Sequence, residues 1–357
     1  MNITAYLLTL HSITIVNLPI GILSLYVVYH HSPSSMHKLY RRLLLVHITM
    51  IMFCDLCMTI FTTPIMLAPT IGFYMEGVLQ WLNVPTFTQF SILIFFIMGT
   101  CTTVDLLFHF RFDVLLNHSH RFKLRNKTKY FFYTFSVFVC GIGPSPVLYF
   151  IFPGQEDMNF TKFNLSLKYE ELREELLLDH TIATSLIQST YAYFVYIVTV
   201  IAIIVILSTV GFFIYYSFRM VNSLSNNMST VTRRQSRHFL RALIAQSTVH
   251  LFVLVTPLIC VCVVQMGFGY LNRDLTNGMV CLFSFHGTLG LLTMLLVTNP
   301  YRRAFCMLLN KVFGCLNANV VQTGSTSVTQ VSSTGRSSLV DRRLERPPSN
   351  RRVHFQA

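Results

Sequence analysis

Residues 43–68 read LLLVHITMIMFCDLCMTIFTTPIMLA, and this stretch decides the fold. It is almost entirely apolar, yet it carries one acidic residue, Asp55, near its middle. About 20 apolar residues in a helix cross the roughly 30 Å hydrocarbon core of a bilayer. Runs of this kind recur along the chain with polar or charged residues between them. We therefore expect residues 43–68 to be one of several membrane-spanning helices.

Seven such runs are found, and together they predict an all-α membrane protein with a seven-transmembrane helix bundle. Helices are expected because backbone groups in lipid must be bonded within the segment, and the runs lack the alternating pattern of barrel strands. Prolines inside the runs are interpreted as kinks, since neighbouring helices can bond the carbonyls that they free. The predicted spans are residues 6–29, 43–68, 87–108, 130–152, 191–218, 242–268 and 278–298, and the prolines are Pro19, Pro64, Pro144, Pro146 and Pro257.

The composition supports a bilayer as the solvent. Hydrophobic residues make up 53% of the chain and charged residues 11%, whereas soluble domains are about one quarter charged. The net charge of +13 does not indicate a nucleic-acid partner, because the bases lie in loops between apolar spans and not on one solvated face. The first apolar run lacks a basic leader and a cleavage pattern, so we interpret it as a retained span.

Basic residues predict the orientation of the bundle. They concentrate in the loops after spans one, three and five and in the C-terminal tail, whereas most acidic residues lie in the other loops. By the positive-inside rule the basic loops are cytoplasmic, which places the N-terminus outside and the C-terminus in the cytoplasm. The basic loop residues are Lys38, Arg41, Arg42, Arg111, Arg121, Lys123, Arg125, Lys127, Lys129, Arg219, Arg233, Arg234, Arg237 and Arg241.

A central polar site is expected around Asp55. An ionisable group at mid-bilayer costs several kcal/mol unless it is paired or hydrated, which makes it a functional candidate. Asn17, Thr102 and His286 lie at a similar depth in their spans. Two interpretations stay open: a cation or proton site that couples helix rearrangement to ligand binding, or a carboxylate that only fixes packing.

Two further sites are expected from the spans. Asp105 and His109 are four residues apart on one helical face, so a local ion pair could hold an inactive state; the alternative is an ordinary membrane boundary. Aromatic residues with a few polar groups in the outer halves of the spans predict an apolar cavity for a small organic ligand, although lipid-facing packing explains them as well. The residues selected for this cavity are Phe95, Tyr193, Tyr196, Gln265, Phe283 and His286.

No enzyme motif is present in the sequence. It contains no HExxH, no GxSxG, no Walker loop and no His or Cys cluster with metal-ligand spacing. We therefore expect no catalytic residue, no metal and no cofactor.

Taken together, the motifs in these spans resemble the nematode serpentine chemoreceptors of class H, within the Str-like group of seven-transmembrane G-protein-coupled receptors. The resemblance covers about residues 6–303. The matching residues are Pro19, Ser32-Pro33, Met36, Asp55, Pro64, Pro69, Gly72, Gly77, Pro85, Gln89, Pro153-Gly154-Gln155, His286-Gly287-Thr288 and Pro300-Tyr301-Arg302. Two features depart from rhodopsin-like receptors: residues 149–190 contain no cysteine for a disulfide, and His109-Phe110-Arg111-Phe112 replaces Asp/Glu-Arg-Tyr.

The resemblance implies a receptor in the plasma membrane of sensory-neuron cilia that detects an odorant or pheromone-like molecule and activates a heterotrimeric G protein. The expected G-protein face consists of Arg111, His109, Arg233, Arg234, Arg237 and Arg302. The rival hypotheses are a seven-span transporter or ligand-gated channel that uses Asp55, and a receptor that only assembles with other membrane proteins.

The sequence predicts that the chain has three parts. Residues 1–303 form the seven-transmembrane receptor domain, residues 304–321 an amphipathic juxtamembrane segment, and residues 322–357 a disordered cytoplasmic tail rich in Ser, Thr and Arg. That tail could be phosphorylated, and a receptor kinase or arrestin is an expected partner there.

Overall fold

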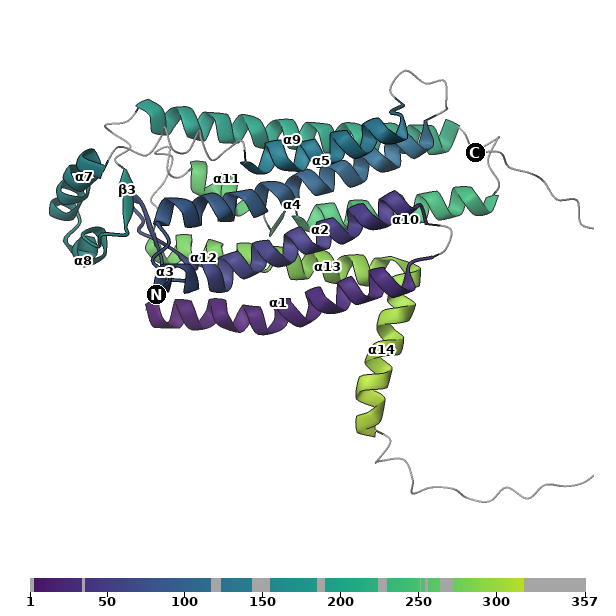
Figure 1. The fold of residues 1–357 in the computed structure, drawn as a ribbon, viewed down its shortest axis with the longest axis horizontal. Coiled ribbons are helices and arrows are strands. Elements are labelled where there is room, and N and C mark those ends of the chain that lie inside the picture. The colour runs from purple at the N-terminus through teal and green to yellow at the C-terminus, as the bar shows by residue number, and fades with distance from the viewer. Residues whose placement is uncertain are drawn as a thin grey trace, which may run out of the picture. The chain divides into compact units, whose positions relative to one another are not determined.

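The computed structural model describes residues 3–33, 36–116, 123–142, 155–184, 190–223, 230–250, 252–253, 256–263 and 272–317. Contacts divide the chain into two units, Met1–Leu309 and Asn310–Ala357. The first unit is a bundle of long helices that run roughly side by side (Figure 1). The described part of the second unit is the end of its last helix.

The bundle is built from ten helices that the structure describes. In it, α2 packs against α1 and α4, α4 packs against α5 and α9, and α10 packs mainly against α13. The helices are α1 (Ile3–His31), α2 (Lys38–Leu56), α4 (Thr86–Leu115), α5 (Asn126–Ile142), α9 (Thr190–Ser223), α10 (Thr230–His250), α11 (Thr256–Val263), α12 (Arg273–Ser284), α13 (His286–Val297) and α14 (Asn299–Asn317). The predicted juxtamembrane segment 304–321 thus lies in α14 up to Asn317, and the tail 322–357 lies outside the described residues.

Within the described residues, four helical segments are long and apolar enough to cross a membrane. They are Ile3–His31, Lys38–Phe61, Thr86–Val114 and Arg273–Val297. The predicted spans 6–29, 87–108 and 191–218 lie inside α1, α4 and α9, which all extend beyond them. The prediction that the apolar runs form helices is therefore confirmed for these three, and Pro19 does lie inside α1.

The predicted end of the second span is wrong. After α2 the chain forms a π-helix, η1 (Cys57–Phe61), and Pro64 then begins a strand. Pro64 lacks an N–H group and disfavours helical backbone at the residue before it. Thr63 at that position is not helical and has a positive φ of 43°. Pro64 ends the span and does not kink it.

Two later spans also differ from prediction. The seventh lies within the segment Arg273–Val297 up to Val297, but it is divided at Phe285, because α12 ends at Ser284 and α13 begins at His286. The sixth begins twelve residues earlier than expected, since α10 starts at Thr230. Pro257 is the second residue of α11, whereas Pro144 and Pro146 lie outside the described residues.

A small antiparallel sheet, which the all-α prediction omitted, lies at one end of the bundle (Figure 1). Its order is β1 (Pro64–Met66), β2 (Ile71–Met75) and β3 (Ile182–Thr184), with Ile65 opposite Tyr74 and Gly72 opposite Ala183. Short helices continue this region: α3 (Val78–Trp81), α7 (Gln155–Lys168), η2 (Glu170–Leu172) and α8 (Arg173–Leu176). We call the sheet and these helices the cap.

Polar contacts tie the cap to the helices. The Tyr6 hydroxyl of α1 donates to the Pro64 carbonyl at 2.6 Å. Asn277 of α12 bonds both backbone groups of Met66, and Arg273 forms an ion pair of 3.1 Å with Glu175. Burial lowers the pKa of Lys162, whose ammonium donates to the Leu178 carbonyl at 2.9 Å.

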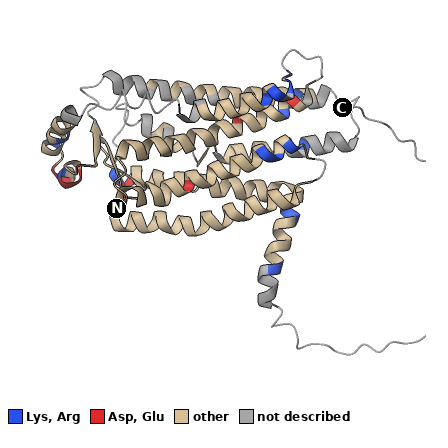
Figure 2. Ribbon diagram, viewed as in Figure 1, with Lys and Arg blue, Asp and Glu red and all other residues tan. Residues whose placement is uncertain are grey.

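Charge separates the two ends of the bundle (Figure 2). Acidic residues gather in the cap, whereas Lys and Arg gather at the opposite end, which we call the basic end. The largest apolar core cluster lies toward that end and combines side chains of α1, α2, α4, α10 and α13, among them Leu44, Ile51 and Leu295.

Gly77 is required where the cap turns back over η1. A Cβ atom at this position would lie 2.3 Å from the Phe61 carbonyl oxygen and 2.6 Å from the Thr62 nitrogen. We expect Gly77→Ala to destabilise the fold by about 1–3 kcal/mol, the usual effect of overpacking, seen as a lower Tm of purified protein in detergent. Gly278→Ala is the matched control, because a Cβ there meets nothing within 4 Å. Equal melting temperatures for the two variants would contradict this account.

Candidate functional site

Asp55 lies at the centre of the bundle against the start of α13. It belongs to the last turn of α2, is only 4% exposed, and has its Oδ1 atom 3.5 Å from Nδ1 of His286. His286 is fully buried and its Nδ1 also lies 2.8 Å from the Phe283 carbonyl. Within the described residues no hydrogen bond reaches Asp55 Oδ1. The carboxyl group therefore depends on the imidazole beside it.

Asn17 of α1 bridges the break between α12 and α13. Its amide nitrogen donates to the Ser284 carbonyl at 2.8 Å, and the Thr288 hydroxyl donates to its amide oxygen. Backbone carbonyls at a helix end lack helical partners, and one side chain here satisfies the end of α12 while holding the first turn of α13. The two helices are thus joined through α1.

Gly287 allows the close approach of α13 to Asp55. A Cβ atom at this position would lie 2.2 Å from Asp55 Oδ2 and 2.5 Å from Cγ2 of Ile51. A side chain of any size would separate α13 from α2. Each residue of the His-Gly-Thr sequence at 286–288 therefore contributes differently. His286 places its imidazole beside Asp55, Gly287 leaves space for the Asp55 side chain, and Thr288 donates its hydroxyl to Asn17.

Three of the four residues predicted for the central site meet here, and Thr102 does not. The Thr102 hydroxyl donates to the Met98 carbonyl of its own helix and is only partly buried. On the other side of Asp55 a small cavity of about 10 Å³ lies between α1 and α2. Asn17 and Asp55 line it, together with residues that the sequence did not single out: Thr14, Leu18, Met52, Leu56 and Thr59.

The residues predicted for a ligand pocket are placed only in part. Phe283 is buried, and its ring centre lies 5.0 Å from that of His286. Phe95 is half-buried and packs edge-on against Phe96. The side chains of Tyr193 and Tyr196, and all of Gln265, lie outside the described residues.

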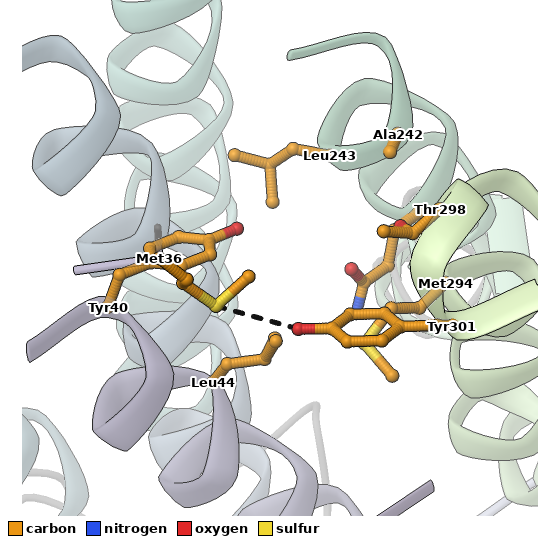
Figure 3. A pocket seen from close by; sticks show the side chains of 9 residues that line it. Met36, Tyr40, Leu44, Ala242, Leu243, Met294, Thr298 and Tyr301 are labelled. Carbon is orange, nitrogen blue, oxygen red and sulfur yellow. Dashed lines mark hydrogen bonds between the residues drawn. The ribbon is translucent and has the colours of Figure 1, made fainter. Parts of the chain in front are cut away.

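A second small cavity, of about 20 Å³, opens at the basic end (Figure 3). Side chains of α2, α10, α13 and the start of α14 surround it: Met36, Tyr40, Leu44, Ala242, Leu243, Gln246, Met294, Thr298 and Tyr301. The Tyr301 hydroxyl crosses the cavity to donate to the Met36 sulfur at 3.6 Å, and it lies 3.2 Å from the Ser32 hydroxyl. We call this space the basic-end cavity.

Arg111 closes one side of this end. Its guanidinium carbon lies 4.0 Å from the centre of the Tyr40 ring, within the range of a cation–π contact. Tyr40 also lines the basic-end cavity. Arg111 thus contacts Tyr40, a partner that the sequence did not indicate.

The predicted ion pair between Asp105 and His109 is wrong. Asp105 accepts hydrogen bonds from Thr209 of α9 at 3.2 and 3.3 Å, while His109 Nδ1 lies 2.9 Å from the Tyr133 hydroxyl of α5. Each residue joins α4 to a different neighbouring helix. The reason is geometric: α4 continues to Leu115, so both residues lie within packed helix and not at its exit.

The ion pair at this end is instead formed by Asp113 and Lys129, both of them buried. Asp113 also accepts from the Leu124 N–H at 3.2 Å, and Lys123 donates to the Leu116 carbonyl at 2.8 Å. These contacts fix the start of α5 against the end of α4. This pair was not predicted, because span three was expected to end at residue 108.

The other residues predicted for a G-protein face lie at the same end. Arg233 and Arg234 are in the first turns of α10, with side chains outside the described residues, and Arg237 follows one turn later, half-buried. Arg302 is exposed and donates to the Asn299 side chain at 3.0 Å. The described backbone thus places these arginines at the basic end.

Membrane-crossing helices, a buried polar centre and a cavity at the basic end define a polytopic membrane receptor. The sequence model of the serpentine type 7TM GPCR chemoreceptor Srh matches residues 2–311 of this chain. The chain belongs to that family: it is a seven-transmembrane chemoreceptor of the plasma membrane and not an enzyme, which confirms the resemblance found in the sequence. Comparison with curated proteins gives no match.

Gly287 provides a test of the central site. We expect Gly287→Ala to lower the Tm in detergent because its Cβ would overlap both Asp55 and Ile51, at a cost of about 1–3 kcal/mol. Gly211→Ala in α9 is the control, since a Cβ there meets nothing within 4 Å. If the new Cβ overlaps Asp55, adding Asp55→Ala to Gly287→Ala should restore part of the lost Tm. If the two substitutions lower the Tm by fully additive amounts, the contact is refuted.

The Asp113–Lys129 pair is tested by removing one partner and then both. The Lys129 side chain is only 8% exposed, and Asp113→Ala removes the carboxylate that pairs with it. Breaking a buried pair in this way lowers the free energy of unfolding by about 3–5 kcal/mol. Replacing Lys129 by Met as well removes the uncompensated charge. We expect the double variant to melt above the Asp113→Ala single variant, and the reverse order would show that the pair is not coupled.

Proposed function

We propose that this protein detects a small odorant or pheromone-like molecule and activates a heterotrimeric G protein. The basic-end cavity carries the proposal, because side chains of α2, α10, α13 and the start of α14 meet there, and separation of these helices would widen it. Ligand binding needs only to favour the arrangement in which the cavity is wider. A partner that fills the widened cavity then stabilises the same arrangement.

The charges around this cavity suit a cytoplasmic partner. Exposed bases surround it at the ends of the helices, and Asp113, the acidic residue that the described chain places at this end, is already paired with Lys129. The positive-inside rule assigns such an end to the cytoplasm, and we propose this orientation, with the N-terminus and the cap outside. The exposed bases are Lys38, Arg42, Arg125, Lys127, Arg219, Arg241, Arg302 and Arg303.

The ligand would bind between the cap and the central polar site. The rings of Phe283 and His286 pack against each other, and His286 lies beside the Asp55 carboxyl group. A largely apolar site with one or two polar groups suits a small organic molecule. Phe95, Tyr193, Tyr196 and Gln265 are proposed to complete the pocket. Sensory cilia as the location, and a receptor kinase or arrestin at the tail, belong to the same proposal.

The experiment is expression of the full chain in a heterologous cell with a G-protein nucleotide-exchange readout and a panel of odorants. We expect at least one compound to raise exchange, with no effect in cells that carry an empty vector. Asp55→Asn keeps the size of the side chain but removes its charge, so we expect it to change the response to that compound while surface expression persists. A ligand-dependent current that continues in cells without G proteins would instead support a transporter or channel that uses Asp55.

A further inference from the structure

His47 connects three helices through both of its ring nitrogens. Nε2 lies 3.1 Å from the amide nitrogen of Gln246 in α10, and Nδ1 lies 2.8 Å from the hydroxyl oxygen of Thr103 in α4. The Thr103 hydroxyl then donates to the Thr100 carbonyl at 2.9 Å. His47, Thr103 and Gln246 are each at most 3% exposed. A chain of buried hydrogen bonds thus runs from α10 through α2 to α4.

The order of donors follows from the chemistry of the groups. The Gln246 amide nitrogen can only donate, so Nε2 of His47 accepts. The single proton of a neutral imidazole is then on Nδ1, from which it donates to Thr103. One side chain that both accepts and donates is needed at this position, and neither an aliphatic nor a phenyl side chain can supply that.

The bond between His47 and Gln246 lies at the floor of the basic-end cavity. Leu44 and Leu243 face the cavity from α2 and α10 (Figure 3), and each is followed three residues later by one partner of the bond. Residues three apart lie on the same helical face, so the bond continues the two cavity walls one turn deeper. Empty space separates α10 from α2 at the cavity itself, and below it the hydrogen bond joins them.

We infer that His47 is a positioning residue that holds α10 against α2 and α4 and so keeps the basic-end cavity narrow. The inference rests on the proposed function in one respect, namely that widening of this cavity accompanies signalling. Separation of α10 would leave buried polar groups on Gln246 and His47 without partners. A single buried hydrogen bond between neutral groups shifts such an equilibrium by about two- to tenfold.

The test uses Gln246→Leu, His47→Phe and their combination in the full chain. Gln246→Leu removes the amide and leaves an apolar side chain in its place, so it remains informative if His47→Phe lowers surface expression. Thr248→Ala is the matched control on α10, because Thr248 is exposed and bonds only the Ile244 carbonyl of its own helix in the described contacts. Surface expression of each variant is measured first.

Opening of the cavity is read from an introduced cysteine, Ala242→Cys, in permeabilised membranes. Ala242 lines the cavity and is 6% exposed, so a soluble thiol reagent should react slowly with it in the parent. Labelling of the chain without this substitution is subtracted, because native cysteines are present. We expect each single variant to raise the rate by about two- to tenfold, the double variant to react no faster than either, and Thr248→Ala to match the parent.

Ligand-independent nucleotide exchange is measured in parallel. Faster labelling with raised exchange supports both the inference and the proposed function. Faster labelling without exchange for any G protein tested supports the role of His47 and counts against the proposed function. Unchanged labelling in Gln246→Leu, or additive effects in the double variant, would overturn the inference whatever the exchange assay gives.

Discussion

The burial of the Asp55 carboxyl group beside His286 constrains the middle of this receptor. A carboxyl group far from water requires a partner, and the partner here is supplied where α12 ends and α13 begins. That break exposes backbone groups which must also be satisfied, and Asn17 of α1 bonds them. The break, the glycine at 287 and the asparagine in α1 are thus consequences of placing one acid at this depth. Four helices are fixed relative to one another by the arrangement.

The cap shows how the chain closes the opposite end in the absence of a cysteine between residues 149 and 190. Strand β3 comes from the segment before α9 and pairs with β2 from the segment after α2, so backbone hydrogen bonds join the two loops. Ion pairing of Arg273 with Glu175 adds α12 to the same assembly. Burial raises the pKa of Tyr74 to about 12, although Arg273 acts to lower it. The Tyr74 phenol is therefore neutral across physiological pH. A sheet with polar contacts thus holds the segment before α9, whereas rhodopsin-like receptors use a disulfide.

The sequence predicted the helices better than it predicted their contacts. Length and apolar content were sufficient for α1, α4 and α9, and depth in the span was sufficient to select Asp55, Asn17 and His286. The rotation of a helix about its axis was harder to predict, because α4 is apolar on all sides and gives no indication of its buried face. Thr102 was therefore selected, whereas its neighbour Thr103 is the residue that faces α2. Successive side chains of a helix with 3.6 residues per turn point in directions about 100° apart.

The strands β1 and β3 are three residues long, and strands so short depend on tertiary pairing that local sequence does not encode.

One face of α2 links the central site to the basic end. Tyr40, Leu44, His47, Ile51 and Asp55 are all buried, and their spacings of three and four residues place them along a single stripe. This stripe meets Arg111 at one end, Gln246 in its middle and Gly287 with His286 at the other. The distance from Tyr40 to Asp55 is about 22 Å at 1.5 Å per residue. Close-packed interiors transmit displacements because side chains have few alternative positions. A change at His286 that shifts or rotates α2 would therefore also alter the bond between His47 of α2 and Gln246 of α10. The physical connection between a ligand near His286 and the basic-end cavity is therefore the rigid helix α2, with His47 at the point where that helix contacts α10.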